Sequence, residues 1–554
     1  MRRLGKITGI VLLSLIFLVA GIFLYLVIVT NVNPPDHRNI SDLNIHRKQI
    51  DTNCYVAGNN WLRKSNSGLW EMYVEGDAFT IGAVNGILAK ELIHEQEEAF
   101  RDQIYQIVPS PFYRNFLKYL IGWFNRNLDS YIADEYKLEI AGVSEAASSE
   151  FDYIGEPYQR MMNYHAAHDI GHALQNLALV GCSSFATWDE KSQGKKLLIG
   201  RNFDFYVGDH FAENKIVQFV NPDKGFKFMM ITWGGMIGVV SGMNMQGLTI
   251  TLNAAKSEIP SGSATPISIV AREILQYAKN IPEAVAIARS RKTFVSESFL
   301  IGSLNDNKAV TLEITPDTLT VYDTNKNNLI CTNHYKSNYL GKSEINREQM
   351  ENSASVYREK RLAELLDTLS ENTPEKTAAV LRNQKGLNNS FIGYGNEKSV
   401  NQLIAHHAVI FEPGEKKVWV STHPWQLGAF MCYDLDDIFA MNGLKINYEL
   451  VDSLNTIPPD TFLLTKEYND FKLFRELKYK ITKGNSSDVE QLIKLNPEYY
   501  SSYVIAGDYM FKQKEFVKAK NYYELALTKE VATIQEQKYI REQLDKCIRK
   551  SGKI

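Results

Sequence analysis

The sequence predicts an α+β protein with a layered core of antiparallel sheets, one apolar helix at the N-terminus and a helical C-terminal region. Three observations predict this arrangement: an apolar run at Ile7–Val29, short β-rich segments from about residue 177 to 437, and helical periodicity without strand patterns after that. The chain has 554 residues, 44% of them hydrophobic, so it can bury at least one large core and is expected to contain two or more structural units.

The N-terminal apolar run is expected to be an uncleaved membrane anchor spanning residues 1–35. It is long enough to cross a hydrocarbon layer of roughly 30 Å. It follows the basic stretch MRRLGK and is followed by TNVNPPDHRN, which lacks the small-x-small pattern of a signal-peptide cleavage site. The basic flank predicts a cytoplasmic N-terminus, which places the catalytic domain on the non-cytoplasmic side of the cell membrane. A buried core helix is the alternative.

Residues 36–181 are expected to form a mixed, largely helical segment ahead of the core. LWEMYVEG at residues 69–76 predicts a short strand, and the residues from Ile87 onward have the apolar spacing of a long amphipathic helix. The aromatic-rich stretch FYRNFLKYLIGWFNRN at residues 112–127 predicts a core helix. An apolar lid, or a surface that lies on the bilayer, is the alternative for this stretch.

Residues 182–437 are expected to form the core. Strand-like runs such as KLLIGRNFDF and GLTITLNAA are separated by Gly, Asn and Asp turns, and residues 266–290 read as helical before strands resume. Strands, two helices and strands again predict a layered α/β arrangement with antiparallel sheets. His406 and His407 are adjacent in a predicted strand and should point to opposite sides, so at most one should face the core.

Charge and cysteine content exclude several function classes. The net charge is −3 without long basic or acidic runs, so we expect no nucleic-acid partner. The five cysteines have no CxxC pair and no zinc-binding spacing, so we expect no disulfide framework, no metal and no cofactor; they are Cys54, Cys182, Cys331, Cys432 and Cys547. An odd count leaves at least one free thiol.

Cys182 stands in the stretch LVGCSSFATW, at the head of a predicted strand. A cysteine nucleophile needs a proton acceptor and donors for the developing oxyanion, and cleavage of the peptide bond before Cys182 would make its own α-amino group the base. Gly181 leaves room for attack of the thiol on the preceding carbonyl. The local pattern is therefore compatible with an N-terminal nucleophile, although a buried cysteine in a strand is common.

Several spaced motifs occur in a fixed order: GCSSFA, LLIGRNFDF, SGMNMQGLTITLN, CTNHY and an S-x-x-R pattern in SVYREKR. Together they resemble the acyl-CoA:6-aminopenicillanate acyltransferase-like family of cysteine N-terminal nucleophile hydrolases, which is related to penicillin V acylase and bile salt hydrolase. The resemblance extends from about Gly76 to about Leu435. It implies a four-layer αββα core and chemistry on linear amides.

The resemblance also implies a role for each motif residue. Cys182 matches the nucleophile, and Arg201 and Asp204 match the pair beside it, with the carboxylate accepting from the new α-amino group. Asn253 matches an oxyanion-hole residue and Asn333 a second active-site amide. Arg358 matches a distal arginine, with Arg361, one turn on, as the alternative.

These roles predict a membrane-anchored cysteine amidohydrolase that cleaves a small-molecule or lipid-like N-acyl substrate through a thioester. Self-processing between Gly181 and Cys182 is expected. An acyltransferase using the same nucleophile remains an alternative, as does a non-catalytic scaffold that binds a protein partner through its C-terminal helices.

Two further patterns lie outside this set of motifs. His165, His168 and His172 share one face of a predicted helix, which suits either zinc binding or histidines that pack upstream of the cleavage point. Residues 438–554 are expected to be helical. They resemble one good and one degraded tetratricopeptide repeat, with a plain helical hairpin as the alternative; the matching positions are Tyr503, Ala506, Gly507, Ala519, Tyr523 and Ala526, with Pro497 ending the preceding unit.

Overall fold

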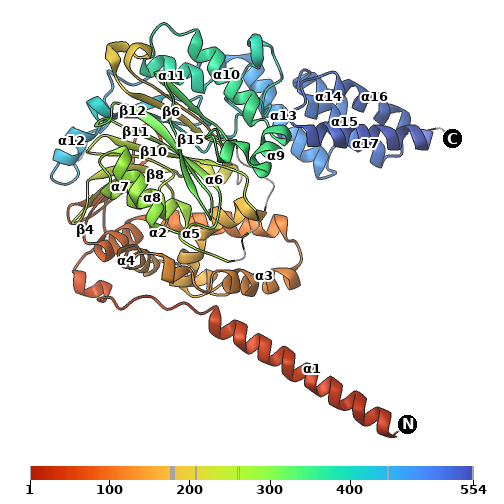
Figure 1. Ribbon diagram of the computed structural model, residues 1–554, viewed down its shortest axis with the longest axis horizontal. Helices are drawn as coiled ribbons and strands as arrows, with labels where there is room; N and C mark the ends of the chain where they lie inside the picture. The colour runs from red at the N-terminus through yellow and green to blue at the C-terminus, as the bar shows by residue number, and fades with distance from the viewer. Residues whose placement is uncertain are drawn as a thin grey trace.

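Two β-sheets packed face to face form the centre of the protein, and helices cover both outer faces (Figure 1). The computed structural model describes residues 2–174, 181–205, 209–258, 260, 262–445 and 448–551. This arrangement confirms the mixed α/β architecture that the sequence predicts.

The larger sheet has eleven strands in the order β1-β2-β3-β4-β7-β8-β9-β10-β11-β12-β13. Every neighbouring pair is antiparallel except β4 and β7, which are parallel. The strands are β1 (Lys48–Asp51), β2 (Cys54–Ala57), β3 (Asn60–Lys64), β4 (Trp70–Gly76), β7 (Ile216–Pro222), β8 (Phe228–Thr232), β9 (Ser241–Asn244), β10 (Leu248–Ala254), β11 (Glu297–Ser303), β12 (Lys308–Ile314) and β13 (Leu319–Tyr322). Of the first four strands, the sequence predicted only the one at β4.

The smaller sheet has six antiparallel strands in the order β14-β5-β6-β15-β16-β17. They are β14 (Asn328–Cys331), β5 (Ser183–Thr187), β6 (Leu198–Phe203), β15 (His407–Glu412), β16 (Lys417–Ser421) and β17 (Phe430–Asp434). In the register of β5 and β6, Ser184 is opposite Arg201. This pairing brings the GCSSFA and GRNFDF motifs side by side.

Apolar side chains fill the space between the two sheets, where Phe219 and Ile231 of the larger sheet belong to the same cluster as Ile199 and Val409 of the smaller one.

Helices cover the outer face of the larger sheet: α2 (Ala78–Ile107), α4 (Asp134–Ser144), α5 (Pro157–Leu174), α7 (Ile267–Tyr277) and α8 (Ile281–Ser290). On the outer face of the smaller sheet lie α10 (Ser355–Asp367) and α11 (Pro374–Leu381). The α6 helix (Asp209–Glu213) contributes Phe211 to the cluster on the larger sheet, and α12 (Leu435–Ala440) contributes Phe439 to the cluster between the sheets. The α9 helix spans Glu344–Asn352. Strands covered on both faces are apolar on both faces, which explains their continuous hydrophobic runs.

His406 and His407 are both fully buried, so the prediction that at most one faces the core is wrong. Alternate residues of β15 pack into two different clusters, with Val409 against the larger sheet and Ala408 against the helices. His406 lies just before β15 rather than in it, and its Nδ1 atom is 2.9 Å from Nδ1 of His407, so the two rings lie side by side and both are buried.

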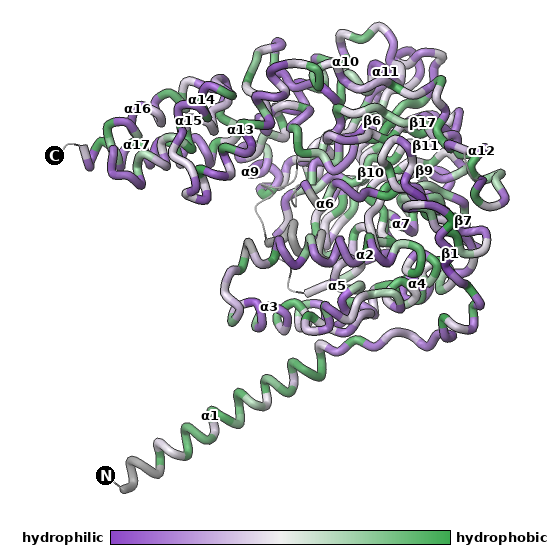
Figure 2. Tube along the Cα trace, turned by 180° about the vertical axis from the view of Figure 1, so that it is seen from behind, coloured by the Kyte–Doolittle hydropathy of each residue, from purple (hydrophilic) through white to green (hydrophobic). Residues whose placement is uncertain are grey.

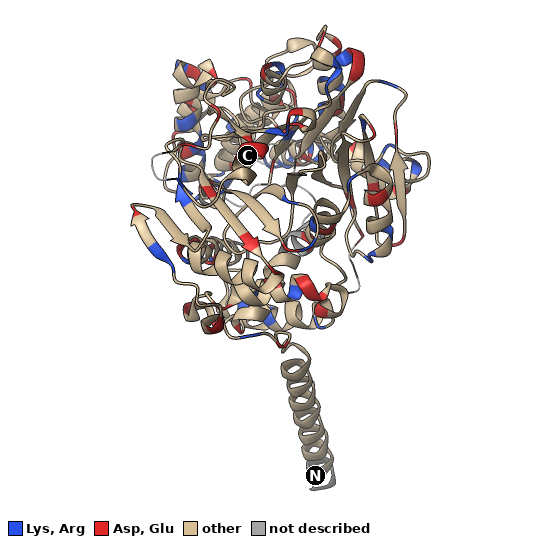
Figure 3. Ribbon diagram, turned by 90° about the vertical axis from the view of Figure 1, so that its left-hand side faces the viewer, with Lys and Arg blue, Asp and Glu red and all other residues tan. Residues whose placement is uncertain are grey.

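The α1 helix (Arg2–Val29) projects from the body (Figure 1) and is mostly hydrophobic along its length (Figure 2). Its segment Ile7–Val29 has a mean hydropathy of 3.0 and none of it is buried. By length and composition this segment fits either a membrane span or a signal sequence. It appears as an uncharged rod in Figure 3, in contrast to the mixed red and blue residues of the body.

The α3 helix (Pro111–Phe124) contains the aromatic-rich stretch, and the prediction that it is a core helix is wrong. Phe112 and Phe116 are 77% and 57% exposed, and Tyr113 and Leu120 are exposed as well. The α3 helix also contacts α1, where the Phe23 and Tyr119 rings lie 5.3 Å apart. Periodicity indicated one apolar face, but no described element covers it.

Five helices follow the sheets and form a separate lobe (Figure 1): α13 (Lys466–Thr482), α14 (Val489–Leu495), α15 (Tyr500–Lys512), α16 (Phe516–Leu527) and α17 (Ile534–Ser551). Gly507 of α15 packs against Tyr523 of α16, where a Cβ atom would lie 2.7 Å from the ring. The lobe shares its apolar cluster with Leu403 and Trp425 of the body. The helical prediction is confirmed, and the tetratricopeptide-like assignment stays a prediction.

Candidate active site

Cys182 immediately precedes β5, in the middle of the smaller sheet, and its side chain is fully buried. The guanidinium of Arg201, on the neighbouring strand β6, donates from Nη2 to the Cys182 sulfur at 3.8 Å. The sequence therefore places a thiol and a cation together through one strand pairing.

The guanidinium of Arg201 is fixed by backbone groups of the larger sheet. Its Nη1 atom donates to the Val240 carbonyl at 2.7 Å and to the Ser241 hydroxyl, and Nη2 donates to the Leu252 carbonyl. Its charge also faces the Phe203 ring, whose centroid lies 4.3 Å away. The cation beside the sulfur is therefore held rigidly from both sheets.

Asp204 follows the end of β6 and contacts the residue before the nucleophile. Its carbonyl accepts from the Gly181 N–H at 3.0 Å, and its Oδ2 atom accepts from Gln402 at 3.2 Å. Burial raises the pKa of the Asp204 carboxyl to about 7, against the opposing effects of Arg358 and Arg201. A carboxyl with this pKa can exchange a proton near neutral pH.

Burial also controls the state of the Cys182 thiol. It raises the pKa of the thiol to about 11, while Arg201 lowers it and the charges of Asp204 and Glu297 raise it. In the continuous chain the thiol is therefore protonated at neutral pH. Attack by the sulfur requires a group that accepts this proton.

The two predicted asparagines connect the two sheets next to Cys182. Asn253 of β10 accepts from the Ser184 hydroxyl at 2.8 Å and donates to the Cys331 carbonyl at 3.0 Å. Asn333 follows β14 and donates to the Ala254 carbonyl at 2.9 Å. Each of these donated bonds uses one amide hydrogen, and each amide nitrogen carries a second one.

Arg358 of α10 donates from Nη2 to the Asn333 Oδ1 atom at 2.5 Å. Burial lowers the pKa of Arg358, and the nearby charges of Asp204 and Cys182 oppose that shift. Arg361, one turn further along α10, instead hydrogen-bonds away from the thiol, to Asn383, Glu364 and Asn389. Of the two arginines weighed in the sequence, Arg358 is the one beside the candidate nucleophile.

The structure thus brings all six predicted residues to one buried junction between the sheets, and it adds groups that the motifs did not include. Gln402, in the loop before β15, donates from Nε2 to the Gly181 carbonyl at 2.8 Å. His407 hydrogen-bonds the Ser241 hydroxyl at 2.8 Å, behind Arg201. No spacing rule identifies Gln402, because it is 220 residues from Cys182 and lies in an irregular loop.

The histidines of α5 are only partly described. His165 is buried, its Nδ1 atom donates to the Met161 carbonyl at 2.7 Å, and its Nε2 atom accepts from the Ile237 N–H at 3.0 Å. Burial lowers the pKa of His165 to about 4. Both ring nitrogens are occupied, so His165 has the packing role considered above; the side chains of His168 and His172 lie outside the described part.

Among the described residues, His94, Glu98 and Glu150 form one group whose ligand atoms lie within 4.8 Å of one another. Arg101 forms ion pairs with Glu98 at 3.2 Å and with Glu150 at 3.7 Å. A cation already neutralises both carboxylates, and the group is partly exposed. We assign no metal to it.

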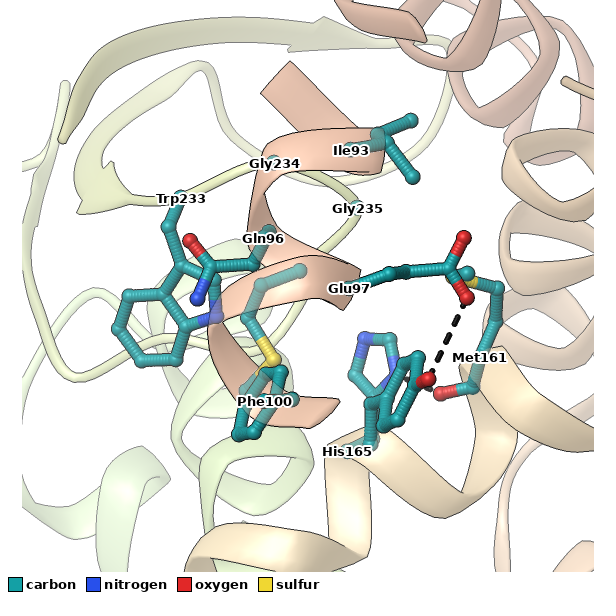
Figure 4. A pocket seen from close by; sticks show the side chains of 11 residues that line it. Ile93, Gln96, Glu97, Phe100, Met161, His165, Trp233, Gly234 and Gly235 are labelled. Carbon is teal, nitrogen blue, oxygen red and sulfur yellow. Dashed lines mark hydrogen bonds between the residues drawn. The ribbon is translucent and has the colours of Figure 1, made fainter. Parts of the chain in front are cut away.

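A small pocket between α2, α5 and the 233–236 loop has a cavity volume of about 10 Å³, which is room for one water molecule (Figure 4). Apolar side chains dominate its lining, including Ile93, Phe100, Met161 and Trp233. Ring contacts lead from Trp233 through Phe211, Phe205 and Phe203 to Arg201, with centroid separations between rings of 5.1, 5.9 and 5.7 Å. An apolar wall therefore connects this pocket to the cation beside Cys182.

Comparison with known proteins supports the predicted resemblance. Residues 189–424 match the family described as acyl-coenzyme A:6-aminopenicillanic acid acyl-transferase. The matched segment begins after Cys182 and contains the other five predicted site residues: Arg201, Asp204, Asn253, Asn333 and Arg358.

Two curated relatives are similar over part of the chain. An uncharacterized protein of Archaeoglobus fulgidus is 23% identical over 269 residues, covering 46% of this chain and 44% of the relative. Protein dcd1B of Dictyostelium discoideum is 22% identical over 272 residues, covering 46% of this chain and 51% of the relative. The alignments thus span about half the length of these relatives.

Two solved structures are similar to part of this chain. The N-acylethanolamine-hydrolyzing acid amidase ortholog of Caenorhabditis elegans is 17% identical with a TM-score of 0.31, covering 42% of this chain and 93% of that chain. A mutant conjugated bile acid hydrolase of Clostridium perfringens is 13% identical with a TM-score of 0.32, covering 46% of this chain and 93% of that chain.

Proposed function

Residues 189–424 belong to the acyl-coenzyme A:6-aminopenicillanic acid acyl-transferase family, and from this premise we propose that the protein is a cysteine amidohydrolase. It cleaves a linear amide through a thioester on Cys182. The observation that carries the proposal is the 3.8 Å contact between the Arg201 guanidinium and the Cys182 sulfur, at the junction where Asp204 binds Gly181. A cation fixed beside a thiol stabilises the thiolate.

The proposed reaction has two halves. The sulfur attacks the amide carbonyl carbon, the S–C bond forms, the C–N bond breaks, and the amine leaves with the thiol proton. Water then attacks the thioester, releasing the acid and restoring the thiol. The α-amino group of Cys182, freed by processing and held by Asp204, carries the proton between these steps.

Asn253 and Asn333 supply the donors for the oxyanion. Each holds its position with one amide hydrogen and offers the second to the oxygen that becomes negative. Removing one such donor typically costs about 100- to 1,000-fold in rate. Arg358 orients Asn333 through the 2.5 Å bond and adds positive charge.

Self-processing between Gly181 and Cys182 is part of the proposal. The thiol is fully buried, and the peptide bond ties up the α-amino group that the mechanism needs. Cleavage would release that amine and free Gly181 to move away from the sulfur. The row of aromatic rings from Phe203 to Trp233, beside Arg201, supports an apolar acyl group as the substrate part recognised here.

The location is proposed to be a membrane surface, with α1 as a single-pass anchor and the sheets on the non-cytoplasmic side. The exposed aromatic face of α3 supports this placement because α3 contacts the end of α1. An aromatic face of this kind suits the interfacial layer of a bilayer. A lipid-like N-acyl compound is the corresponding substrate class.

Acyl transfer is the second candidate reaction, since an amine can replace water in the second half. We favour hydrolysis because acyl-CoA donors are cytoplasmic and the proposed anchor points the domain away from them. Adding an acceptor amine separates the two: a condensed product that forms faster than the free acid assigns acyl transfer.

The third candidate is a non-catalytic scaffold whose tetratricopeptide-like C-terminal lobe binds a protein partner. The grouping of five polar or charged residues around one thiol disfavours it, since a scaffold does not need them. Absence of thiol reactivity at Cys182, together with specific capture of one protein by the intact chain, would assign the scaffold role.

The test of the proposed function uses the Cys182→Ala and Cys182→Ser variants on a panel of chromogenic amides. Both should lose at least about 100-fold in amide cleavage with an unchanged melting temperature. Cys432→Ala is the matched control, because Cys432 is equally buried in the same sheet, on β17. Full activity of Cys182→Ala would overturn the proposal.

A further inference from the structure

The side-chain amide of Gln402 hydrogen-bonds two groups. One is the Gly181 carbonyl, in the peptide bond proposed to be cut, and the other is the Asp204 carboxylate, proposed to bind the new amine. Gln402 is buried, and its Nε2 atom lies 2.8 Å from the Gly181 carbonyl oxygen and 3.2 Å from Oδ2 of Asp204. One amide nitrogen carries two hydrogens, so it can make both bonds at once. The Gly181 oxygen is the atom that becomes negative if Cys182 attacks.

Gly181 allows this approach. A Cβ atom on Gly181 would lie 2.3 Å from the Gln402 Nε2 atom, closer than any real contact. Any larger residue at position 181 would push the amide away from the carbonyl. The requirement for glycine before Cys182 thus follows from Gln402 as well as from access of the thiol.

The loop that carries Gln402 is held in a defined and costly conformation. Leu403 has a φ of +55°, in the left-handed region that leucine rarely adopts. The Asn401 Oδ1 atom accepts from the Leu403 N–H at 2.8 Å, and the Ser399 hydroxyl donates to the Asn401 carbonyl at 2.8 Å. Strain kept in place by several hydrogen bonds is typical of functional sites.

We propose that Gln402 is a catalytic residue for self-processing, donating a hydrogen bond to the oxyanion that forms on the Gly181 carbonyl oxygen. This inference rests on the proposed processing reaction and adds its oxyanion donor. In the step, the Cys182 sulfur bonds to the Gly181 carbonyl carbon, the C–N bond breaks, and the thiol proton moves to the departing nitrogen of Cys182. Water then cleaves the resulting thioester, leaving a Gly181 carboxylate and a free thiol.

The donor geometry suits this step. A donor 2.7–3.1 Å from the developing oxyanion is the spacing at which such groups act, and Gln402 is already at 2.8 Å before the reaction begins. Its second hydrogen is donated to the Asp204 carboxylate, the proposed acceptor of the new α-amino group. Gln402 therefore contacts both the carbonyl that is attacked and the carboxylate proposed to bind the amine that is released.

The test follows processing of the full chain after cell-free synthesis, with samples quenched over time and separated by size. Gln402→Met keeps the length and removes the donor, and we expect a processing rate at least about 100-fold below the wild type. Gln218→Met is the matched control, because Gln218 is fully buried on β7 and neither of its amide atoms has a hydrogen-bond partner in the described structure. It should process at the wild-type rate.

A second variant separates an oxyanion donor from a structural role. Gln402→Glu donates only when its carboxyl is protonated, so its processing rate should rise as the pH falls, whereas a role in packing alone gives no such rise. This profile also decides the question if Gln402→Met does not fold. Processing of Gln402→Met within threefold of the wild-type rate overturns the inference, as does a Gln402→Glu rate that does not rise at low pH.

Failure of the proposed function has a different signature. A wild-type chain that stays uncut, or a Cys182→Ala chain that is cut, contradicts self-processing by Cys182 and removes the basis for Gln402. A wild-type chain that is cut, with Cys182→Ala uncut and Gln402→Met cut normally, contradicts only the role of Gln402.

Discussion

The Nη2 atom of Arg201 lies 3.8 Å from the sulfur of Cys182, and both residues are fully buried. Burial raises the pKa of the thiol to about 11, and the charge of Arg201 acts against this rise. The register of β5 and β6 sets this contact, since Ser184 is opposite Arg201. The cation is therefore the main charge that favours the thiolate.

Removal of this cation should shift the pH dependence of the enzyme. In Arg201→Met the pKa of the thiol should rise. The ascending limb of the pH–rate profile for amide cleavage should therefore move to higher pH by about one unit or more. At pH 7 the rate should fall about 10-fold or more, with the rate of Arg201→Lys between those of the wild type and Arg201→Met. Rates measured between pH 6 and 10 check this. An unchanged limb in Arg201→Met would contradict the assigned role.

Arg358 and Arg361 form a natural pair of variant and control on one helix. Arg358→Met removes the bond to Asn333 and a positive charge near Asp204, so kcat/KM should fall by about 10- to 100-fold. Arg361→Met removes bonds to Asn383, Glu364 and Asn389, so it should destabilise the fold by about 1–3 kcal/mol and leave kcat/KM within threefold. Kinetics and urea unfolding measured together check both. The reverse pattern would mean that Arg361 is the functional arginine.

The stability of the fold should rise with pH because of Lys215. This lysine is buried, its Nζ atom is 2.9 Å from the His406 carbonyl, and burial lowers its pKa to about 7 from 10.5. Between these two values the unfolded chain binds one more proton than the native state, so the free energy of unfolding should increase by up to about 1.4 kcal/mol per pH unit. Below pH 7 both states bind the proton, so the free energy of unfolding no longer changes with pH through Lys215 and the cost of its buried charge is at its maximum.

The Lys215→Met variant should lack that rise, while Lys224→Met, a change at an exposed lysine, should retain it. Urea midpoints measured from pH 6.5 to 10.5 give the difference between the slopes. Parallel slopes for the wild type and Lys215→Met would show that Lys215 titrates normally in the fold.

The exposed face of α3 should enter the interfacial layer when the full chain is reconstituted in phospholipid vesicles. An environment-sensitive fluorophore attached to Phe112→Cys should emit at shorter wavelength in vesicles than the same dye emits in buffer. The same dye on Leu464→Cys, an 87% exposed site in the C-terminal region, is the control and should report water. A Cys54→Ser background removes the one partly exposed native thiol. Equal emission at the two sites would exclude bilayer contact of α3.

The residues of the site could be predicted because their motifs occur in the order of a family that the chain resembles, whereas local pattern alone indicated only Cys182 as a candidate. Cys182, Arg201 and Asp204 lie on or beside two consecutive strands, and a short antiparallel connection brings consecutive strands together. Asn253 and Asn333 were found through motif order in the same way. Gln402 could not be found, because its contact with Gly181 depends on the path of an irregular loop 221 residues away in sequence.

The fold shows the same limit. The apolar runs of the core predicted its strands, yet β1 at the sheet edge was missed because it has no such run, with Lys48, Gln49 and Asp51 exposed. The β3 strand was missed although it is mostly buried, because its sequence NWLRK mixes polar and apolar residues. The aromatic spacing of α3 identified a shared face, but spacing does not tell whether another element covers that face. Coverage is a tertiary property, and in this chain the face remains exposed.

Intact mass spectrometry of the purified full chain tests the central claim most directly, because it reports both the nucleophile and the bond that it cuts. We expect two polypeptides, the second beginning at Cys182, and a single uncut chain for Cys182→Ala. An active wild-type preparation that consists of one uncut chain would contradict the account.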